Sequence, residues 1–224
     1  MRRGSMAELT LPYLTPDRAL IFRVTHVANL PWILEHGLVC QNSEIRDPNF
    51  KRIGNADVIG KRQACPVPIP PGGMLADYVP FYFTPLSVTL FNIVTGYGGV
   101  ERVPRGDLVI LASSLHELAR SGVRFVCTDR HALLRTARFS NSLSELGALI
   151  DWKRLQARDF KRDPENPEKL ERYQAEALIH GSLPVHALTG LACSTSDQVA
   201  GFEAAVASRN LAIKVVAKPG WFFS

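Results

Sequence analysis

The number and spacing of short strand-like segments constrain the fold of this chain more than any other feature. Seven runs of four to six residues are rich in Val, Ile, Leu, Ala and aromatic side chains, and they lie at 20–25, 78–83, 108–112, 125–128, 175–179, 188–193 and 212–216. Helical patterns lie at 26–36, 115–120, 129–135, 142–150 and 197–208. The strands do not alternate regularly with helices of about 12 residues, as they do in doubly wound parallel sheets. The sequence therefore predicts the α+β class.

The composition is that of a globular domain. Of 224 residues, 46% are hydrophobic and 21% are charged, a balance that excludes disorder of the whole chain. No apolar run approaches the ~18 to 20 residues of a membrane-spanning helix, so no membrane partner is expected. We expect residues 1–19 to be an N-terminal extension, with 1–5 resembling a remnant of cloning, and residues 20–224 to form a single domain.

The cysteines and histidines exclude several kinds of site. No two cysteines have C-x-x-C spacing, and we expect reduced thiols in a cytoplasmic protein at Cys40, Cys65, Cys127 and Cys193. The six histidines do not cluster at metal-ligand spacing, so no metal is expected. The absence of G-x-G-x-x-G and Walker A motifs argues against a dinucleotide held in the Rossmann manner. The net charge of +5 permits an anionic partner without requiring one.

Glu176 is the most unusual polar residue of the predicted strands. It stands between Ala175 and Ala177, and period-two alternation places it on one face with Gln174 and Leu178. A carboxylate is costly to bury without partners, so from the residues alone an edge strand with Glu176 facing water is the simpler interpretation. The alternative is a carboxylate that lines a cleft, where it could act as a general base or stabilise a cation.

The segment 25–29, Thr-His-Val-Ala-Asn, joins the first predicted strand to the first predicted helix. In the simpler interpretation Thr25 caps the helix, while His26 and Asn29 satisfy local backbone groups. Alternatively, these are strand-end polar groups that recognise an amide or a ribose. The helix that follows is expected to end at Gly37, because a residue with positive φ is favourable there.

Further segments carry groups that could bind a nucleotide. Residues 41–73 form a long loop whose basic side chains are either solvated or act as forks for phosphates. These side chains are Lys51, Arg52, Lys61 and Arg62. The aromatic run 78–83 is expected to pack the core with one face, while the other could provide a stacking platform. Pro80 predicts an edge or the start of a strand, and the charged segment 151–172 is expected to be mobile.

Five groups of segments occur in an order that is typical of one known family. They lie at 25–31 with 33–38, at 77–83, at 139–140 with 146–147, at 172–176, and at 214–216 with 218–223. Taken together they resemble the DarT toxins, which are DNA ADP-ribosyltransferases. The resemblance covers about residues 20 to 223. The shared order of the motifs, rather than any single one of them, carries the resemblance.

The resemblance implies an ADP-ribosyltransferase fold, in which two small packed β-sheets with flanking helices surround an NAD+ cleft. It implies transfer of ADP-ribose from NAD+, as a substrate, to a base of single-stranded DNA, with release of nicotinamide. By motif match Glu176 is the catalytic glutamate. Arg62 matches the arginine that supports catalysis and contacts NAD+, with Lys61 and Arg52 as weaker candidates.

The same resemblance assigns the remaining site residues. His26 and Asn29 are expected to hold the nicotinamide ribose or carboxamide, and Tyr82 is expected to belong to the NAD+ site. Segment 151–175 matches the substrate-recognition loop, in which Arg172 and Tyr173 are expected to contact DNA. Toxins of this type are paired with a macrodomain antitoxin of the DarG type, which is the expected protein partner.

The chain departs from the family pattern in two places. Residues 84–87, Thr-Pro-Leu-Ser, lie where many relatives have an arginine, and 129–132, Asp-Arg-His-Ala, replace a more common Asp-Gly-Asn-Ala. Both lie where the nucleic acid is expected to be read, so Arg130 and His131 are expected DNA contacts. The departures favour guanosine over thymidine as the target base.

Two alternative functions remain open from the sequence. An RNA 2′-phosphotransferase-like enzyme shares an early His, an Ile-Leu-x-x-Gly-Leu helix and the use of NAD+, but it would not need the strand motif around Glu176. A non-catalytic nucleic-acid-binding module would explain the charge alone. Substitution of Glu176 by Ala separates the three, because only the first hypothesis expects loss of DNA modification with DNA binding retained.

Overall fold

The computed structural model describes residues 11–223. Its main element is an eight-stranded sheet with the strand order β10-β9-β4-β1-β3-β7-β5-β6. These strands are β1 (Leu20–His26), β3 (Tyr78–Tyr82), β4 (Leu108–Ser114), β5 (Phe125–Thr128), β6 (Phe139–Ser140), β7 (Glu176–His180), β9 (Gly190–Cys193) and β10 (Lys214–Ala217). A separate two-stranded ladder pairs β2 (Leu38–Val39) with β8 (Ser182–Leu183). Antiparallel pairing dominates, and β9 with β10 is parallel, so the α+β class is confirmed.

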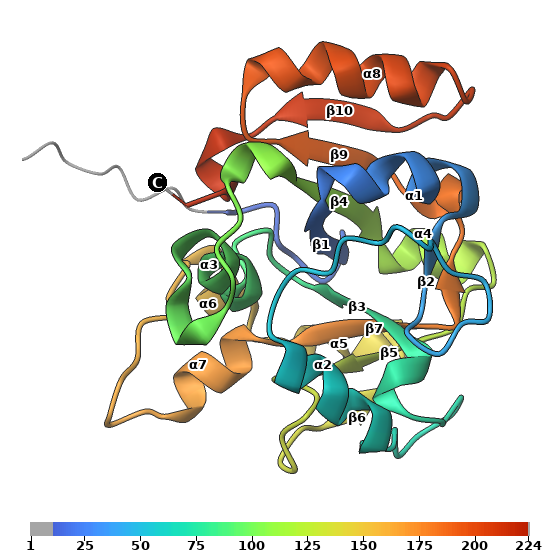
Figure 1. Ribbon diagram of the computed structural model, residues 1–224. Coiled ribbons are helices and arrows are strands. Elements are labelled where there is room, and N and C mark those ends of the chain that lie inside the picture. Colours follow the sequence, from blue (N-terminus) through green and yellow to red (C-terminus); the bar gives the residue numbers. More distant parts are fainter. Residues whose placement is uncertain (1–10, 224) are drawn as a thin grey trace, which may run out of the picture.

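The large sheet consists of two halves that meet at one residue pair. β1 pairs with β4 along its whole length, but it pairs with β3 only where Phe22 lies opposite Tyr82. Strands β10, β9, β4 and β1 form one half, and strands β3, β7, β5 and β6 form the other. In Figure 1 the first half lies above the second. The expectation of two small packed sheets therefore needs correction, because this single bridge joins both halves into one sheet.

Pro80 accounts for the separation of β1 and β3 beyond that pair. The prediction of an edge strand was wrong, since β3 lies between β1 and β7. The guanidinium of Arg23 on β1 donates from Nη1 to Pro80 O at 2.7 Å. The backbone N and C=O of one strand residue point to the same side of the strand, and Pro80 O points towards β1. The nitrogen of Pro80 therefore also faces β1, and it has no hydrogen to donate to that strand. An arginine side chain thus takes the place of a backbone ladder.

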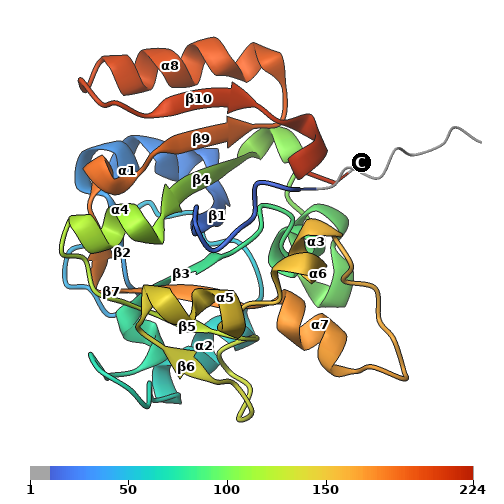
Figure 2. The ribbon, with the colours of Figure 1, turned by 180° about the vertical axis from the view of Figure 1, so that it is seen from behind.

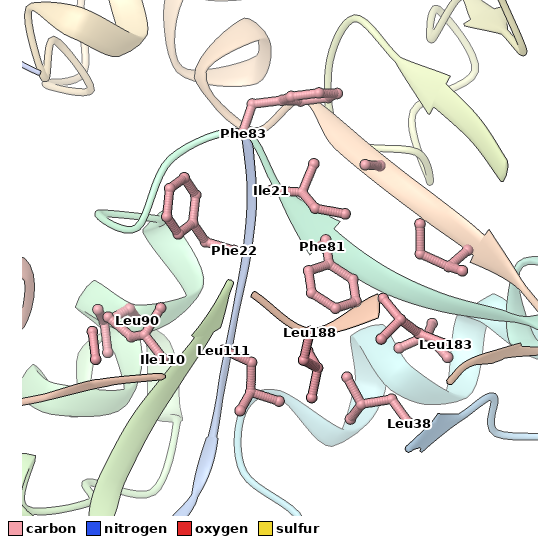
Figure 3. Close-up of a cluster of buried hydrophobic side chains, with 14 of the residues drawn as sticks. Ile21, Phe22, Leu38, Phe81, Phe83, Leu90, Ile110, Leu111, Leu183 and Leu188 are labelled. Atoms are coloured by element: carbon pink, nitrogen blue, oxygen red, sulfur yellow. The ribbon is translucent and has the colours of Figure 1, made fainter. Parts of the chain in front are cut away.

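The hydrophobic core lies on both sides of β1, because alternate residues of a strand point to opposite faces. Figure 3 shows Phe22 and Leu90 on one side of this strand and Ile21 and Phe81 on the other. All four side chains are buried. Full burial of a side chain of this size stabilises the fold by about 1.5 to 3 kcal/mol. Side-chain packing therefore holds the two halves together where the backbone pairing is interrupted.

The helices are short and flank the sheet. They are α1 (Leu30–His36), α2 (Ala56–Lys61), α3 (Val88–Thr95), α4 (Leu115–Arg120), α5 (Leu146–Leu149), α6 (Trp152–Gln156), α7 (Glu168–Tyr173) and α8 (Val199–Ala207). In Figures 1 and 2, α8 runs along the outer strand β10, while α3, α6 and α7 gather beside the end of β3. Gly37 ends α1 as predicted, with φ of 78° and its N–H donating to Ile33 O at 2.8 Å.

Two helical predictions were wrong in extent or type. Segment 129–135 is a series of turns between β5 and β6, because side chains bind its backbone: Arg138 N–H donates to Asp129 Oδ1 at 2.9 Å, and the Thr128 hydroxyl donates to Arg130 O at 2.6 Å. Segment 142–150 is α-helical only in α5, after a 3-10 turn.

The charged segment 151–172 is more ordered than its composition predicts. It contains α6 and most of α7, and the side chains of Trp152 and Leu155 are buried in the core. The Trp152 indole N–H donates to Leu146 O at 2.9 Å. Apolar residues at a few positions of a charged stretch are thus enough to anchor it.

The start of the described chain belongs to the packed domain. Leu11 and Leu14 are buried, and Leu11 N–H donates to Gln156 O at 3.1 Å. The predicted domain boundary at residue 20 therefore does not coincide with a break in packing. The expectation for residues 1–5 lies outside the described residues. Among the described residues, no helix is long and apolar enough to cross a membrane.

Candidate active site

A cavity of about 840 Å³ opens on the face of the sheet where β1 and β3 separate. Figure 1 shows the segment between β2 and α2 crossing in front of the sheet at this place, and that segment supplies another wall of the cavity. The polar side chains of the lining include Arg23, Thr25, Arg46, Arg52, Arg62, Tyr82, Thr89, Asn92 and His131. Guanidinium forks bind phosphate oxygens bidentately, so this lining suits an anionic nucleotide.

Alternation along β3 divides its aromatic residues between the core and the cavity. Tyr78, Pro80 and Tyr82 line the cavity, whereas Phe81 is fully buried in the core. The predicted division of this strand into a packing face and an open face holds only in part, because Val79 also lines the cavity and Tyr78 is buried. The Tyr82 hydroxyl forms a 2.7 Å hydrogen bond with Thr89 Oγ1, and burial raises the pKa of Tyr82 to about 12. Tyr82 is therefore neutral at physiological pH.

Glu176 is the first residue of β7, where it lies opposite Tyr82 of β3. The interpretation as a solvent-facing edge residue was wrong, because β7 lies between β3 and β5 and Glu176 is 0% exposed. Its carboxylate accepts two hydrogen bonds of 2.9 Å, at Oε2 from Arg62 Nη1 and at Oε1 from the Ala132 N–H. The burial of this carboxylate is thus compensated by a charged and a backbone donor.

The electrostatics of the site keep Glu176 ionised. Burial by itself raises the pKa of this carboxyl, but the charge of Arg62, the nearby His131 and the Ala132 N–H together hold the pKa below its usual value. His131 Nδ1 lies 3.7 Å from Glu176 Oε1, and both His131 and Arg62 line the cavity. A charged carboxylate therefore lies directly behind the cavity wall.

Comparison with known proteins identifies the family. The model for the family described as "ssDNA thymidine ADP-ribosyltransferase, DarT" matches residues 22–223. The chain belongs to the DarT family. A DNA ADP-ribosyl transferase of Escherichia coli O127:H6 is 48% identical over 211 residues, which are 94% of this chain and 96% of that protein.

Solved structures of DarT proteins agree with this membership. Thermus sp. 2.9 DarT in complex with ADP-ribosylated single-stranded DNA is 32% identical and superposes with a TM-score of 0.83, covering 93% of this chain and 98% of that one. The same protein in complex with NAD+ gives a TM-score of 0.79 at 32% identity, with 93% and 99% covered. The resemblance seen in the motifs is confirmed, and with it the ADP-ribosyltransferase fold. This DarT-family chain is an NAD+-dependent DNA ADP-ribosyltransferase, which favours the first of the three hypotheses.

The structure brings together only some of the residues that the DarT resemblance assigns to NAD+. Arg62 and Tyr82 line the cavity, and so does Arg52. His26 does not line it, and its Nδ1 accepts a hydrogen bond of 3.0 Å from the Ala28 N–H as an N-cap.

Asn29 has a structural role in this DarT-family chain. It is fully buried, its Oδ1 accepts from the Lys51 N–H at 2.7 Å, and its Nδ2 donates to Lys51 O at 2.9 Å and to Thr25 Oγ1 at 3.0 Å. This amide therefore fastens the loop that leads to Arg52 onto the end of β1. It does not line the cavity.

The predicted DNA contacts are placed very differently from one another. Arg172 is half-buried on α7 and pairs with Glu168 at 2.8 Å. Tyr173 is 1% exposed and its hydroxyl donates to Leu86 O at 3.1 Å, so its position does not support a DNA contact. Arg130 is likewise buried, whereas His131 reaches the cavity.

Sequence reasoning missed two parts of the site. Arg23 lines the cavity, and burial lowers its pKa to about 10. The signal was an arginine in the middle of an apolar strand. The Ala132 N–H is the second part, and a backbone donor of this kind leaves no trace in the residue types. In residues 11–223, no group of three or more His, Cys, Asp or Glu side chains is arranged to hold a metal ion.

Proposed function

We propose that Glu176 is the catalytic carboxylate for transfer of ADP-ribose from NAD+ to a base of single-stranded DNA. The observation that carries this role is the ionised, fully buried carboxylate held by Arg62 and the Ala132 N–H behind the cavity wall. A preorganised charge in a water-poor site stabilises developing positive charge far better than it would in water. The rest of the lining supplies groups for a dinucleotide.

The proposed chemistry follows from the charge of Glu176. The bond between the ribose C1′ and nicotinamide breaks, and the ribose acquires oxocarbenium character that the carboxylate stabilises. A nitrogen of the DNA base attacks C1′, and Glu176 accepts the proton that this nitrogen loses. Nicotinamide leaves with the electrons of the broken bond. A base must be unstacked to be attacked, which favours a single strand.

Arg62 is proposed to act on both the carboxylate and NAD+. Its Nη1 binds Glu176, while its buried Nη2 has no hydrogen-bond partner among residues 11–223. A buried donor without a partner is costly, so a ligand oxygen at this atom would satisfy it. Tyr82 and Arg52 are proposed as further NAD+ contacts from their places in the cavity lining. His26 is proposed to contact the nicotinamide ribose or carboxamide of NAD+ through its ring Nε2, because its Nδ1 already accepts a hydrogen bond from the Ala28 N–H.

The target base is tested with four single-stranded oligonucleotides, each of which is composed mainly of a different one of the four bases. The chain is incubated with NAD+ and each single strand, and the modified base is read from the mass of the product. We expect modification of the guanosine strand, because of the departures at 84–87 and 129–132. The description of the family names thymidine, so modification of the thymidine strand instead would refute the guanosine assignment. If no strand were modified, the proposed function itself would be wrong.

Binding of the DNA strand is expected to depend on salt. Arginines 46 and 52 lie at the cavity, and the net charge of the chain is +5. About 2 to 4 phosphate contacts to a single strand give a slope of about 1.4 to 2.8 for the dependence of log Kd on log salt concentration. Fluorescence anisotropy with a labelled oligonucleotide at several salt concentrations measures this slope. Binding that does not change with salt would contradict the role proposed for the basic side chains.

A macrodomain antitoxin of the DarG type and a cytoplasmic location remain proposals from the family resemblance. An antitoxin of this kind would remove the ADP-ribose from DNA after transfer. Incubation of modified DNA with a purified macrodomain partner tests that activity, with loss of the ADP-ribose mass as the expected result. Persistence of the modification would count against this partner.

A further inference from the structure

Arg130 connects the loop beside Glu176 to helix α7. The side chain is 6% exposed and forms bonds in two directions. Within the loop, Nε donates to Asp129 Oδ1 at 3.3 Å and Nη2 donates to Oδ2 at 3.4 Å. Towards α7, Nη1 donates to Glu171 Oε2 at 3.2 Å, and Nη2 lies 3.8 Å from Glu168 Oε2.

The same loop holds the catalytic carboxylate. The Ala132 N–H, two residues after Arg130, donates to Glu176 Oε1 at 2.9 Å. Thr128 donates from its hydroxyl to Arg130 O at 2.6 Å, and it accepts from the Glu176 N–H at 3.2 Å. Both the backbone and the carboxylate of Glu176 are therefore bonded to residues on either side of Arg130.

We propose that Arg130 is a positioning residue that acts on Glu176 through this loop, and that its ion pair with Glu171 couples α7 to the catalytic carboxylate. This inference rests on the proposed role of Glu176. Because only Gln174 and Ala175 separate α7 from β7, a shift of α7 relative to the loop would change both attachments of Glu176 at once. A small misplacement of a catalytic group has a large effect on rate.

The surroundings of Arg130 disfavour a direct DNA contact. Three carboxylates, those of Asp129, Glu168 and Glu171, lie within 4 Å of its guanidinium. A phosphate approaching Arg130 would have to displace or face these negative charges, and most of the fork of the guanidinium is already occupied. The expectation that Arg130 contacts DNA is therefore replaced by a role within the chain.

The test separates catalytic rate from DNA binding. The Arg130→Ala and Glu171→Gln variants are each expected to lower kcat by about tenfold, while the Kd for single-stranded DNA changes by less than about twofold. The double variant is expected to be no slower than Arg130→Ala, because either single change already breaks the pair. Arg130→Lys keeps the charge but not the fork, so an intermediate kcat is expected.

Arg135→Ala is the matched control. Arg135 is an exposed arginine on the same loop and forms no side-chain hydrogen bond or ion pair within residues 11–223, so its removal is expected to leave kcat unchanged. Thermal melting of each variant confirms that it is folded. If Arg130→Ala does not fold, the kcat of Glu171→Gln alone tests the proposal. Glu171→Gln is expected to fold, because the side chain of Glu171 is 36% exposed.

Three results would overturn the proposal. The first is an unchanged kcat in both Arg130→Ala and Glu171→Gln. The second is a raised Kd for DNA in Arg130→Ala with a salt slope reduced by about 0.7, as for a lost phosphate contact. The third is a double variant in which the two losses multiply, because the residues would then act independently. A failure of the proposed function is seen separately, as full activity of Glu176→Ala.

Discussion

The Glu176→Gln variant is expected to transfer ADP-ribose to single-stranded DNA about 10²- to 10³-fold more slowly than the unchanged chain. Glutamine keeps the shape of the side chain, but its single amide oxygen can accept from only one of the two donors that bind Glu176, Arg62 Nη1 and the Ala132 N–H, while its NH2 group faces the other. It carries no charge, so it neither stabilises the positive ribose nor accepts a proton from the base. The rate is measured at saturating NAD+ and DNA by the mass of the modified oligonucleotide.

The loss must be in the chemical step for this assignment to hold. DNA binding by anisotropy is expected to be retained in Glu176→Gln, because Glu176 is fully buried and does not touch solvent. Glu35→Gln is a suitable control, since Glu35 also pairs with an arginine, Arg209 at 2.8 Å, but on the surface of α1. That control should keep the normal rate. Normal transfer by Glu176→Gln would show that another group is the catalytic base.

The Arg62→Ala variant is expected to lose about 3 to 5 kcal/mol of the free energy of unfolding at neutral pH. The change leaves the carboxylate of Glu176 buried with only the Ala132 N–H as a direct donor at 2.9 Å. An uncompensated buried charge is among the most destabilising features that a single substitution can create. Urea denaturation followed by circular dichroism measures the loss. Removal of the half-buried Arg209, whose partner Glu35 is exposed, by the same substitution should cost less than about 1 kcal/mol.

The deficit of Arg62→Ala should depend on pH. In the unchanged chain the pKa of Glu176 is held below its usual value, so the contribution of this group is present at neutral pH and is lost as the pH falls through the folded-state pKa. Without Arg62, burial dominates and raises this pKa, so the variant loses stability as the pH rises. The difference between the two proteins should therefore widen from about pH 4 to about pH 7. A difference that is constant over this range would mean that Arg62 does not set the charge of Glu176.

Local patterns predicted most strands of the sheet but not how they join. The runs at 20–25, 108–112 and 125–128 lie within strands of nearly the same bounds. The two-residue strands β2, β6 and β8 were not predicted, because a strand of two residues has no measurable periodicity. The prediction of a sheet edge at Pro80 follows a sound local rule, because proline has no N–H to donate to a neighbouring strand. Pro80 can nevertheless lie in an inner strand, because Arg23 of β1, 57 positions away in the sequence, donates a hydrogen bond to Pro80 O on the side that faces β1.

The error at segment 129–135 has a similar cause. Its residue types permit a helix, but Asp129 and Thr128 bind the backbone and hold the segment in turns. The prediction that Arg130 contacts DNA rests on its place in segment 129–132, which departs from the family pattern. Its burial depends on carboxylates of α7, about 40 residues later in the chain, which no local pattern shows.

The sequence by itself determined the fold class, the family and the strand that carries Glu176. These follow from side-chain periodicity and from the order of motifs, which are properties of neighbouring residues. Only the tertiary structure decided that Glu176 is buried rather than exposed, and that Arg62, 114 positions earlier, is the partner that keeps it charged. The physical reason is that burial and ion pairing are set by contacts between distant segments, whereas periodicity and capping act over a few residues.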